Sequence, residues 1–111
     1  MLDPHPFSER ETQIARRLIL QIHPRLTVWY HQHMDVVWAY GPSTTAGRLY
    51  AQATGMALYH HLWLPGTSTN WQNHDLPGTA ALTVELPAGV LSQSAVLRHM
   101  RAVLSVTRAL R

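Results

Sequence analysis

Near the start of this chain, apolar residues recur with the spacing of a helix, and a short continuous run of apolar residues follows. Ser8 and Glu11 have the spacing of a capping box, which predicts a helix over residues 9–22. Its apolar residues share one face: Ile14, Leu18, Ile19 and Ile22. A proline disfavours helical geometry in the residue before it, so Pro24 ends this helix, and the apolar run over residues 26–30 predicts a buried strand.

Helix and strand signals continue to alternate up to the carboxyl end. A segment rich in Gly, Ser, Thr, Asn and Pro has the composition of a long surface loop. The further elements are predicted in this order: a helix over 44–54 that ends at Gly55, a short strand within 57–64, the loop over 65–78, a strand over 80–86 and a helix over 92–110. The last helix has an apolar stripe, formed by Val96, Leu97, Met100, Val103, Leu104 and Leu110.

This alternation predicts an α/β fold of three layers, in which helices flank three or four mostly parallel strands. A length of 111 residues is within the range of one domain, so we expect a single domain over residues 1–111. The chain is 46% hydrophobic and only 14% charged, which leaves little polar material for its surface. We therefore expect another subunit to cover part of that surface.

Composition excludes several other classes of protein. The apolar content is too high for a disordered chain, and no uncharged apolar run approaches the length of about 18 residues that spans a membrane. Nine arginines give a formal charge of +3 but are spread along the chain, so we expect solvated helix faces and no nucleic-acid interface. The chain has no cysteine, which leaves nitrogen and oxygen as metal ligands. No basic segment followed by an apolar one is visible at the start, so a cytoplasmic location is expected.

Two histidines follow the first predicted strand, at the end where ligands collect in α/β sheets. His31 and His33 are two residues apart, which on a strand places both side chains on one face, and such pairs bind zinc in hydrolases. The alternative is a pair of partly exposed polar residues, because two ligands alone do not make a site. Candidates for a third ligand remain open: His5, His60, His61 and His74.

Glu85 closes the otherwise apolar strand over residues 80–86 and is one of only six acidic residues. A carboxylate in that place suits a general base that acts on a metal-bound water, although it could instead pair with an arginine. In the predicted loop, Ser68, Asn70 and Trp71 are candidates for substrate binding. Anchoring of the loop by Trp71 explains the same residues equally well.

Four short segments stand in a characteristic order along the chain: residues 6–12, 26–32, 66–71 and 82–86. In order and spacing they resemble the C-terminal half of the zinc carboxypeptidase family, nearest to its branch of bacterial peptidoglycan-peptide amidases. The resemblance implies that His31 is a zinc ligand, that Glu85 is the general base, and that residues 68–71 line the substrate pocket. It also implies a truncated domain whose sheet would continue past this chain.

The chain departs from that family in its other ligands. The family's first two zinc ligands come from a His-x-x-Glu motif, and none of the eight histidines here is followed three residues later by glutamate. The Asn-Arg pair that grips the substrate's terminal carboxylate is also missing. A truncated sheet leaves an unpaired apolar edge, so we expect a homodimer or higher homo-oligomer in which a second copy covers it.

Three functions follow from these observations. The first is a minimal hydrolase in which His31, His33 and a further ligand hold zinc or another divalent metal while Glu85 activates water. We expect such an enzyme to cleave esters, amides or phosphoesters of small-molecule or peptide-like substrates with broad, low-efficiency activity. The alternative is a catalytically inactive remnant that serves as an oligomeric or binding module. The third is one half of a split enzyme whose other half is a separate chain.

Overall fold

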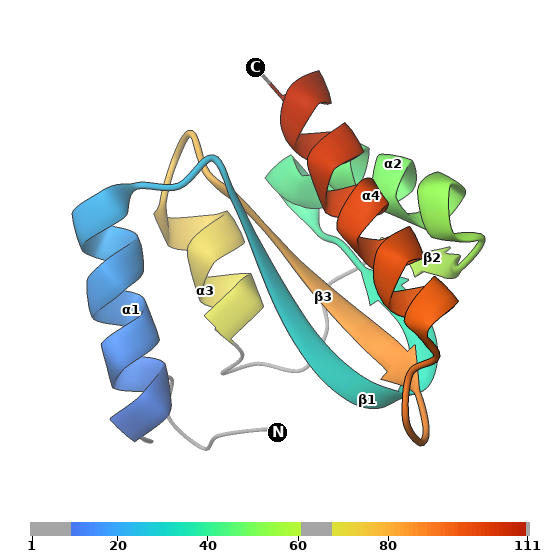
Figure 1. Ribbon diagram of the computed structural model, residues 1–111. Coiled ribbons are helices and arrows are strands. Elements are labelled where there is room, and N and C mark those ends of the chain that lie inside the picture. Colours follow the sequence, from blue (N-terminus) through green and yellow to red (C-terminus); the bar gives the residue numbers. More distant parts are fainter. Residues whose placement is uncertain (1–9, 61–67, 111) are drawn as a thin grey trace.

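Helices and strands alternate along the part of the chain that this computed structural model describes, residues 10–60 and 68–110 (Figure 1). The strands are β1 (Leu26–Trp38), β2 (Ala57–Tyr59) and β3 (Ala80–Pro87). The α-helices are α1 (Arg10–Ile22), α2 (Thr44–Thr54), α3 (Ser68–Asp75) and α4 (Gln93–Ala109), and a 3-10 turn, η1 (Gly41–Ser43), leads into α2. The predicted α/β class is confirmed. Among these helices, none has both the length and the apolarity needed to cross a membrane.

The three strands form a sheet in the order β2-β1-β3, in which the first part of β1 pairs in parallel with β3 and its last residues pair in parallel with β2. β1 is longer than predicted because it turns back on itself. Its first arm, residues 26–33, pairs with β3 in ascending order, whereas in its second arm Val36 pairs with Glu85 and Trp38 with Thr83, in descending order. Thr83 also pairs with Trp29 of the first arm. Because a strand residue has one neighbour on each side, β3 lies between the two arms, and Figure 1 shows β1 curving round the end of β3.

The core lies between the sheet and the helices α2 and α4. Side chains of β3 that point to this face, Leu82 and Val84, are fully buried and contact Tyr50 of α2 and Val106 of α4 within one cluster. Gly47 brings α2 close to the sheet, since a Cβ at that position would lie 2.5 Å from the Cβ of Ala39. The apolar face of the sheet therefore binds two helices at short distance.

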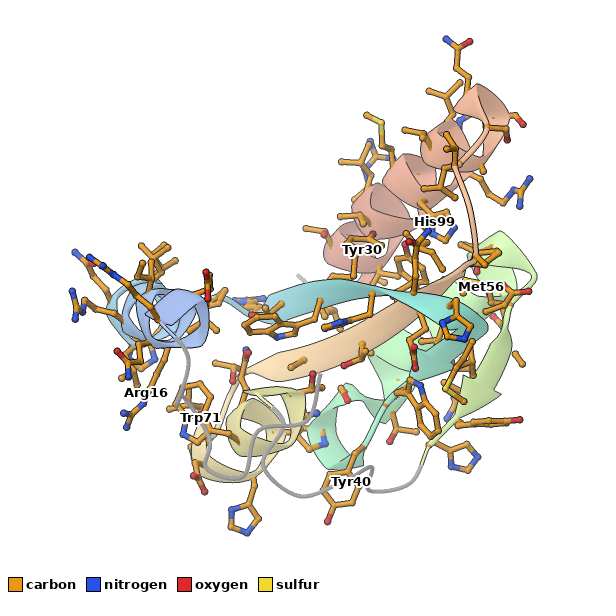
Figure 2. All side chains as sticks on the ribbon, turned by 90° about the horizontal axis from the view of Figure 1, so that it is seen from below. Arg16, Tyr30, Tyr40, Met56, Trp71 and His99 are labelled. Carbon is orange, nitrogen blue, oxygen red and sulfur yellow. The ribbon has the colours of Figure 1, made fainter. Side chains whose placement is uncertain are left out.

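The opposite face of the sheet is polar and is covered by α3 (Figure 2). Gln72 donates to the hydroxyl of Thr27 over 2.9 Å, and Asn73 exchanges two hydrogen bonds with the backbone of Ala81. The hydroxyls of Thr69 and Thr83 are 2.6 Å apart. The prediction of a surface loop over 65–78 was thus wrong for residues 68–75, because a polar helix is held there by side-chain hydrogen bonds to the strands.

The apolar stripes predicted for the first and last helices are largely exposed to solvent. On α1 only Ile19 of the predicted face is buried, and on α4 the side chains of Met100 and Leu104 are 56% and 55% exposed. α4 instead turns His99, Ala102 and Val106 towards the core. The side of α4 that meets the core thus carries the small residue Ala102, while the bulky side chains of Met100 and Leu104 point outwards.

Candidate functional site

His31 and Glu85 are register partners on neighbouring strands. Side chains alternate along a strand, and partners across a parallel pair point to the same face. Glu85 therefore points to the same face as Thr83, which bonds Thr69 of α3, and His31 points there too. This face, at the carboxyl ends of β3 and the first arm of β1, is the candidate site.

Glu85 is held in place by a residue from the second arm of β1. Its side chain is only 4% exposed, and its Oε2 accepts a hydrogen bond of 2.9 Å from the indole Nε1 of Trp38. A buried carboxylate needs such a donor, because an unpaired one would be costly. The Trp38 ring is fixed in turn by an edge-on contact with Tyr59, at 5.1 Å between the ring centroids. The hydrogen-bond partner of Glu85 among the described residues is thus a tryptophan, where an arginine was the predicted alternative.

His31 is exposed, yet its surroundings still alter its proton affinity. Partial burial lowers the pKa of His31, while the negative charge of Glu85 acts in the opposite direction and weakens the shift. The net direction is downwards, so the imidazole is neutral at pH 7. In that form one ring nitrogen can accept a hydrogen bond or bind a metal.

His33 lies where β1 leaves its regular path. It pairs with Pro87 at the end of β3, and the register shifts between His33 and Met34. The register is still regular from His31 to His33 and shifts only beyond His33, so the expected placement of both histidines on one face stays a prediction. Of the other candidate ligands, His60 and His74 are described, and neither forms a metal-binding group with them; His74 of α3 forms an ion pair with the adjacent Asp75, over 2.6 Å. His5 and His61 lie outside the described residues.

The described residues do not make a complete zinc site. In residues 10–60 and 68–110 no three side chains of His, Asp or Glu converge in a way that could hold a metal ion. His31 supplies one nitrogen, and the carboxylate beside it already accepts a hydrogen bond from Trp38. A zinc site normally takes three or four protein ligands, so this donor set does not fit zinc without groups from elsewhere.

The predicted substrate-binding residues Ser68, Asn70 and Trp71 lie on α3. Trp71 faces α1, where the guanidinium carbon of Arg16 is 5.6 Å from the centroid of the indole ring (Figure 2). This contact supports the anchoring interpretation of Trp71, since a cation over an aromatic face is attracted to it. Substrate binding by these three residues stays a prediction.

Trp38 is the site residue that the sequence did not reveal. It is 47 residues from Glu85 along the chain, and only the returning arm of β1 brings the two together. Two further polar atoms on the α3 side of the sheet are buried without a hydrogen-bond partner among the described residues, Nε1 of Trp29 and Oε1 of Gln72. The side of the site that faces α3 is therefore polar, and these two atoms could still donate and accept a hydrogen bond.

Comparison with known proteins finds similarity among solved structures. No family model matches the chain, and no curated protein matches it. Among solved structures, the murein-tripeptide amidase MpaA from Escherichia coli O157 matches with a TM-score of 0.62 and 25% sequence identity. The match covers 94% of this chain but only 41% of the amidase. The chain thus has the hydrolase-like α/β fold of that amidase and spans less than half of the amidase's length.

Proposed function

We propose that this chain is a hydrolase of amide and ester bonds in which Glu85 is the general base. The observation that carries the proposal is the pairing of Glu85 with His31 on one face of the sheet, at the carboxyl ends of parallel strands. The amidase fold that the chain shares adds support, because it is the fold of an enzyme that acts on a peptide-like substrate. Fold alone would not be sufficient, since one fold serves many functions.

Glu85 can both remove and return the proton that hydrolysis transfers. Oε1 of Glu85 removes a proton from a water molecule as the water oxygen adds to the carbonyl carbon of the substrate. When the tetrahedral intermediate collapses, the same carboxyl group returns that proton to the departing amine or alcohol. Trp38 keeps Oε2 in position throughout, so Trp38 is a positioning residue. The neutral imidazole of His31, beside the carboxylate, orients the water or the substrate.

The finer parts of the proposal concern substrate and metal. We assign the chain to the C-terminal half of a zinc carboxypeptidase-like domain, with activity on peptide-like amides, esters and phosphoesters that is broad and slow. Zinc belongs to the proposal only as a group bound by a completed site, to which His31 of this chain would contribute. Because the described residues supply too few ligands, no step above depends on it.

The test is turnover of an activated ester and an activated amide by the 111-residue chain. Glu85→Gln preserves the shape of the side chain and its bond from Trp38 but removes the base, so the rate should fall by about 10²–10⁴-fold. Glu11→Gln, at an exposed position on α1, is the matched control and should leave the rate unchanged. Equal turnover by wild type and Glu85→Gln, with equal melting temperatures, would remove Glu85 from the mechanism.

Metal content is measured on the same samples after reconstitution with zinc. A lower content in His31→Ala than in wild type supports a metal role for His31, and His33→Ala tests the second predicted ligand. Equal content in wild type and His31→Ala excludes His31. A folded wild type with neither turnover nor metal would favour the alternative function, a catalytically inactive binding module.

A further inference from the structure

An apolar groove runs between α4 and the first arm of β1. Tyr30 and Leu86 form its sheet side, and Val96, Met100 and Leu104 form its helix side. A second hollow continues it along Leu26 and Val28 of β1 towards Leu110, and it shares Tyr30 with the first. Exposed apolar side chains in one continuous strip usually mark a surface that another polypeptide covers.

The outer edge of β1 lies next to this groove. The first arm of β1 pairs with β3 on one side, and no other strand of the described residues pairs with it. An unpaired strand presents free backbone N–H and C=O groups, which can bind an added strand. The edge and the groove can therefore be covered by the same partner.

The charges around this surface favour a partner of the opposite sign. Arg25 borders the groove at its far end, and Arg101 and Arg108 project beside Leu104. α4 contains no acidic residue. A second copy would bring the same arginines into apposition, whereas a partner with acidic side chains would neutralise them.

More than half of the matched amidase lies outside the region that this chain covers. We propose that the groove and the outer edge of β1 bind a polypeptide equivalent to that remaining part, which adds a strand along β1, fills the groove with apolar side chains and meets the arginines with acidic ones. The nature of this partner rests on the proposed function, because the same polypeptide completes the active site.

The geometry explains how docking would complete the site. His31 lies on the first arm of β1, whose inner neighbour is β3 with Glu85. A strand added to the outer side of this arm would lie directly beside His31, about 4.8 Å away as in any sheet. Side chains near the carboxyl end of that strand would then reach the same face of the sheet as His31 and Glu85.

The test uses a defined probe, the part of the Escherichia coli O157 amidase that lies outside the match. This probe, with an affinity tag, is co-expressed with the full 111-residue chain, and the amount of chain that co-purifies is measured. Met100→Asp and Leu104→Asp place a charge in the groove and should reduce co-purification at least tenfold. Val90→Asp is the matched control, since Val90 is fully exposed and does not line the groove. Each variant alone should retain the wild-type melting temperature.

Three results would overturn the proposal. The first is that the wild-type chain does not co-purify with the probe, and the second is that Met100→Asp and Val90→Asp co-purify equally. The third is a wild-type homodimer in sedimentation that Met100→Asp converts to monomer, because this result would assign the groove to a second copy. Turnover of the complex is measured separately. A complex that forms through the groove but hydrolyses nothing upholds the docking surface and refutes the proposed function.

Discussion

Replacement of Tyr50 by phenylalanine should destabilise the chain more than the same change at Tyr30. The hydroxyl of Tyr50 is 2.7 Å from the hydroxyl of Tyr30 and 2.7 Å from Nδ1 of His99. Tyr50 is fully buried and His99 is 8% exposed, whereas Tyr30 is 44% exposed. A consistent assignment has Tyr30 donate to Tyr50 and Tyr50 donate to His99, so this chain of bonds joins β1, α2 and α4.

The magnitude follows from what each variant leaves behind. In Tyr30→Phe one bond is lost while Tyr50 still donates to His99, so the free energy of unfolding should fall by about 0.5–1.5 kcal/mol. Tyr50→Phe also leaves Nδ1 of His99 buried without a donor, which costs a further 1–3 kcal/mol or so, for a total of about 2–4 kcal/mol. With a urea m-value of about 1–2 kcal/mol per M, a loss of about 3 kcal/mol lowers the midpoint by about 1.5–3 M.

Urea unfolding followed by circular dichroism at pH 8 measures both losses. Addition of His99→Leu to Tyr50→Phe removes the unpaired nitrogen and should recover part of the loss, because two apolar partners leave no polar group buried. The reasoning would be refuted if Tyr50→Phe cost no more than Tyr30→Phe, or if His99→Leu made the Tyr50→Phe variant still less stable.

Other changes test the packing, the pH dependence and the α3 contacts. Gly47→Ala, which in an exposed helix would stabilise by about 1 kcal/mol, should instead destabilise by about 1–3 kcal/mol, as thermal melting will show, because its Cβ would clash with Ala39. Burial and the nearby Arg98 lower the pKa of His99, against a smaller opposing effect of Asp35. The unfolded chain therefore takes up a proton at higher pH than the folded one. Stability should thus fall as the pH drops below about 6.5, and urea midpoints at pH 7.5 and 5.5 should show a smaller fall in His99→Gln. Asn73→Ala removes both bonds to the backbone of Ala81 and should cost about 2–4 kcal/mol in the same urea assay, whereas Gln52→Ala, on the exposed side of α2, should cost less than about 0.5 kcal/mol.

Local periodicity was sufficient to place most helices and strands in the sequence. The helix over 44–54 and the strand from residue 80 agree with α2 and β3, and Gly55 ends α2 with a φ of 76° as predicted. The second arm of β1 was missed because the segment that leads into it, His31 to Asp35, is exposed and, apart from Met34, polar. Such a turn is fixed by pairing with β3, about 50 residues further along, and leaves no local pattern.

The candidate site was only partly visible in the sequence. His31 and Glu85 were identified by their places at strand ends, and the fold makes them neighbours. The contact between Trp38 and Glu85 and the outward direction of Met100 depend on how distant segments pack. Residue type alone cannot report which of two apolar helix faces meets the sheet, so the surface that remains open could be recognised only in three dimensions.

The position of β3 between the two arms of β1 has a consequence for the order in which the chain can fold. β3 begins at Ala80, long after β1 ends at Trp38, so neither arm can form its ladder with β3 until the third strand arrives. Closing the intervening segment costs conformational entropy before the strand pairings can stabilise the fold. This order predicts slow folding for so small a domain. During synthesis, the apolar start of β1, residues 26–30, must remain unpaired with β3 while about fifty further residues emerge before Ala80, and this is the interval in which the nascent chain is most exposed to aggregation.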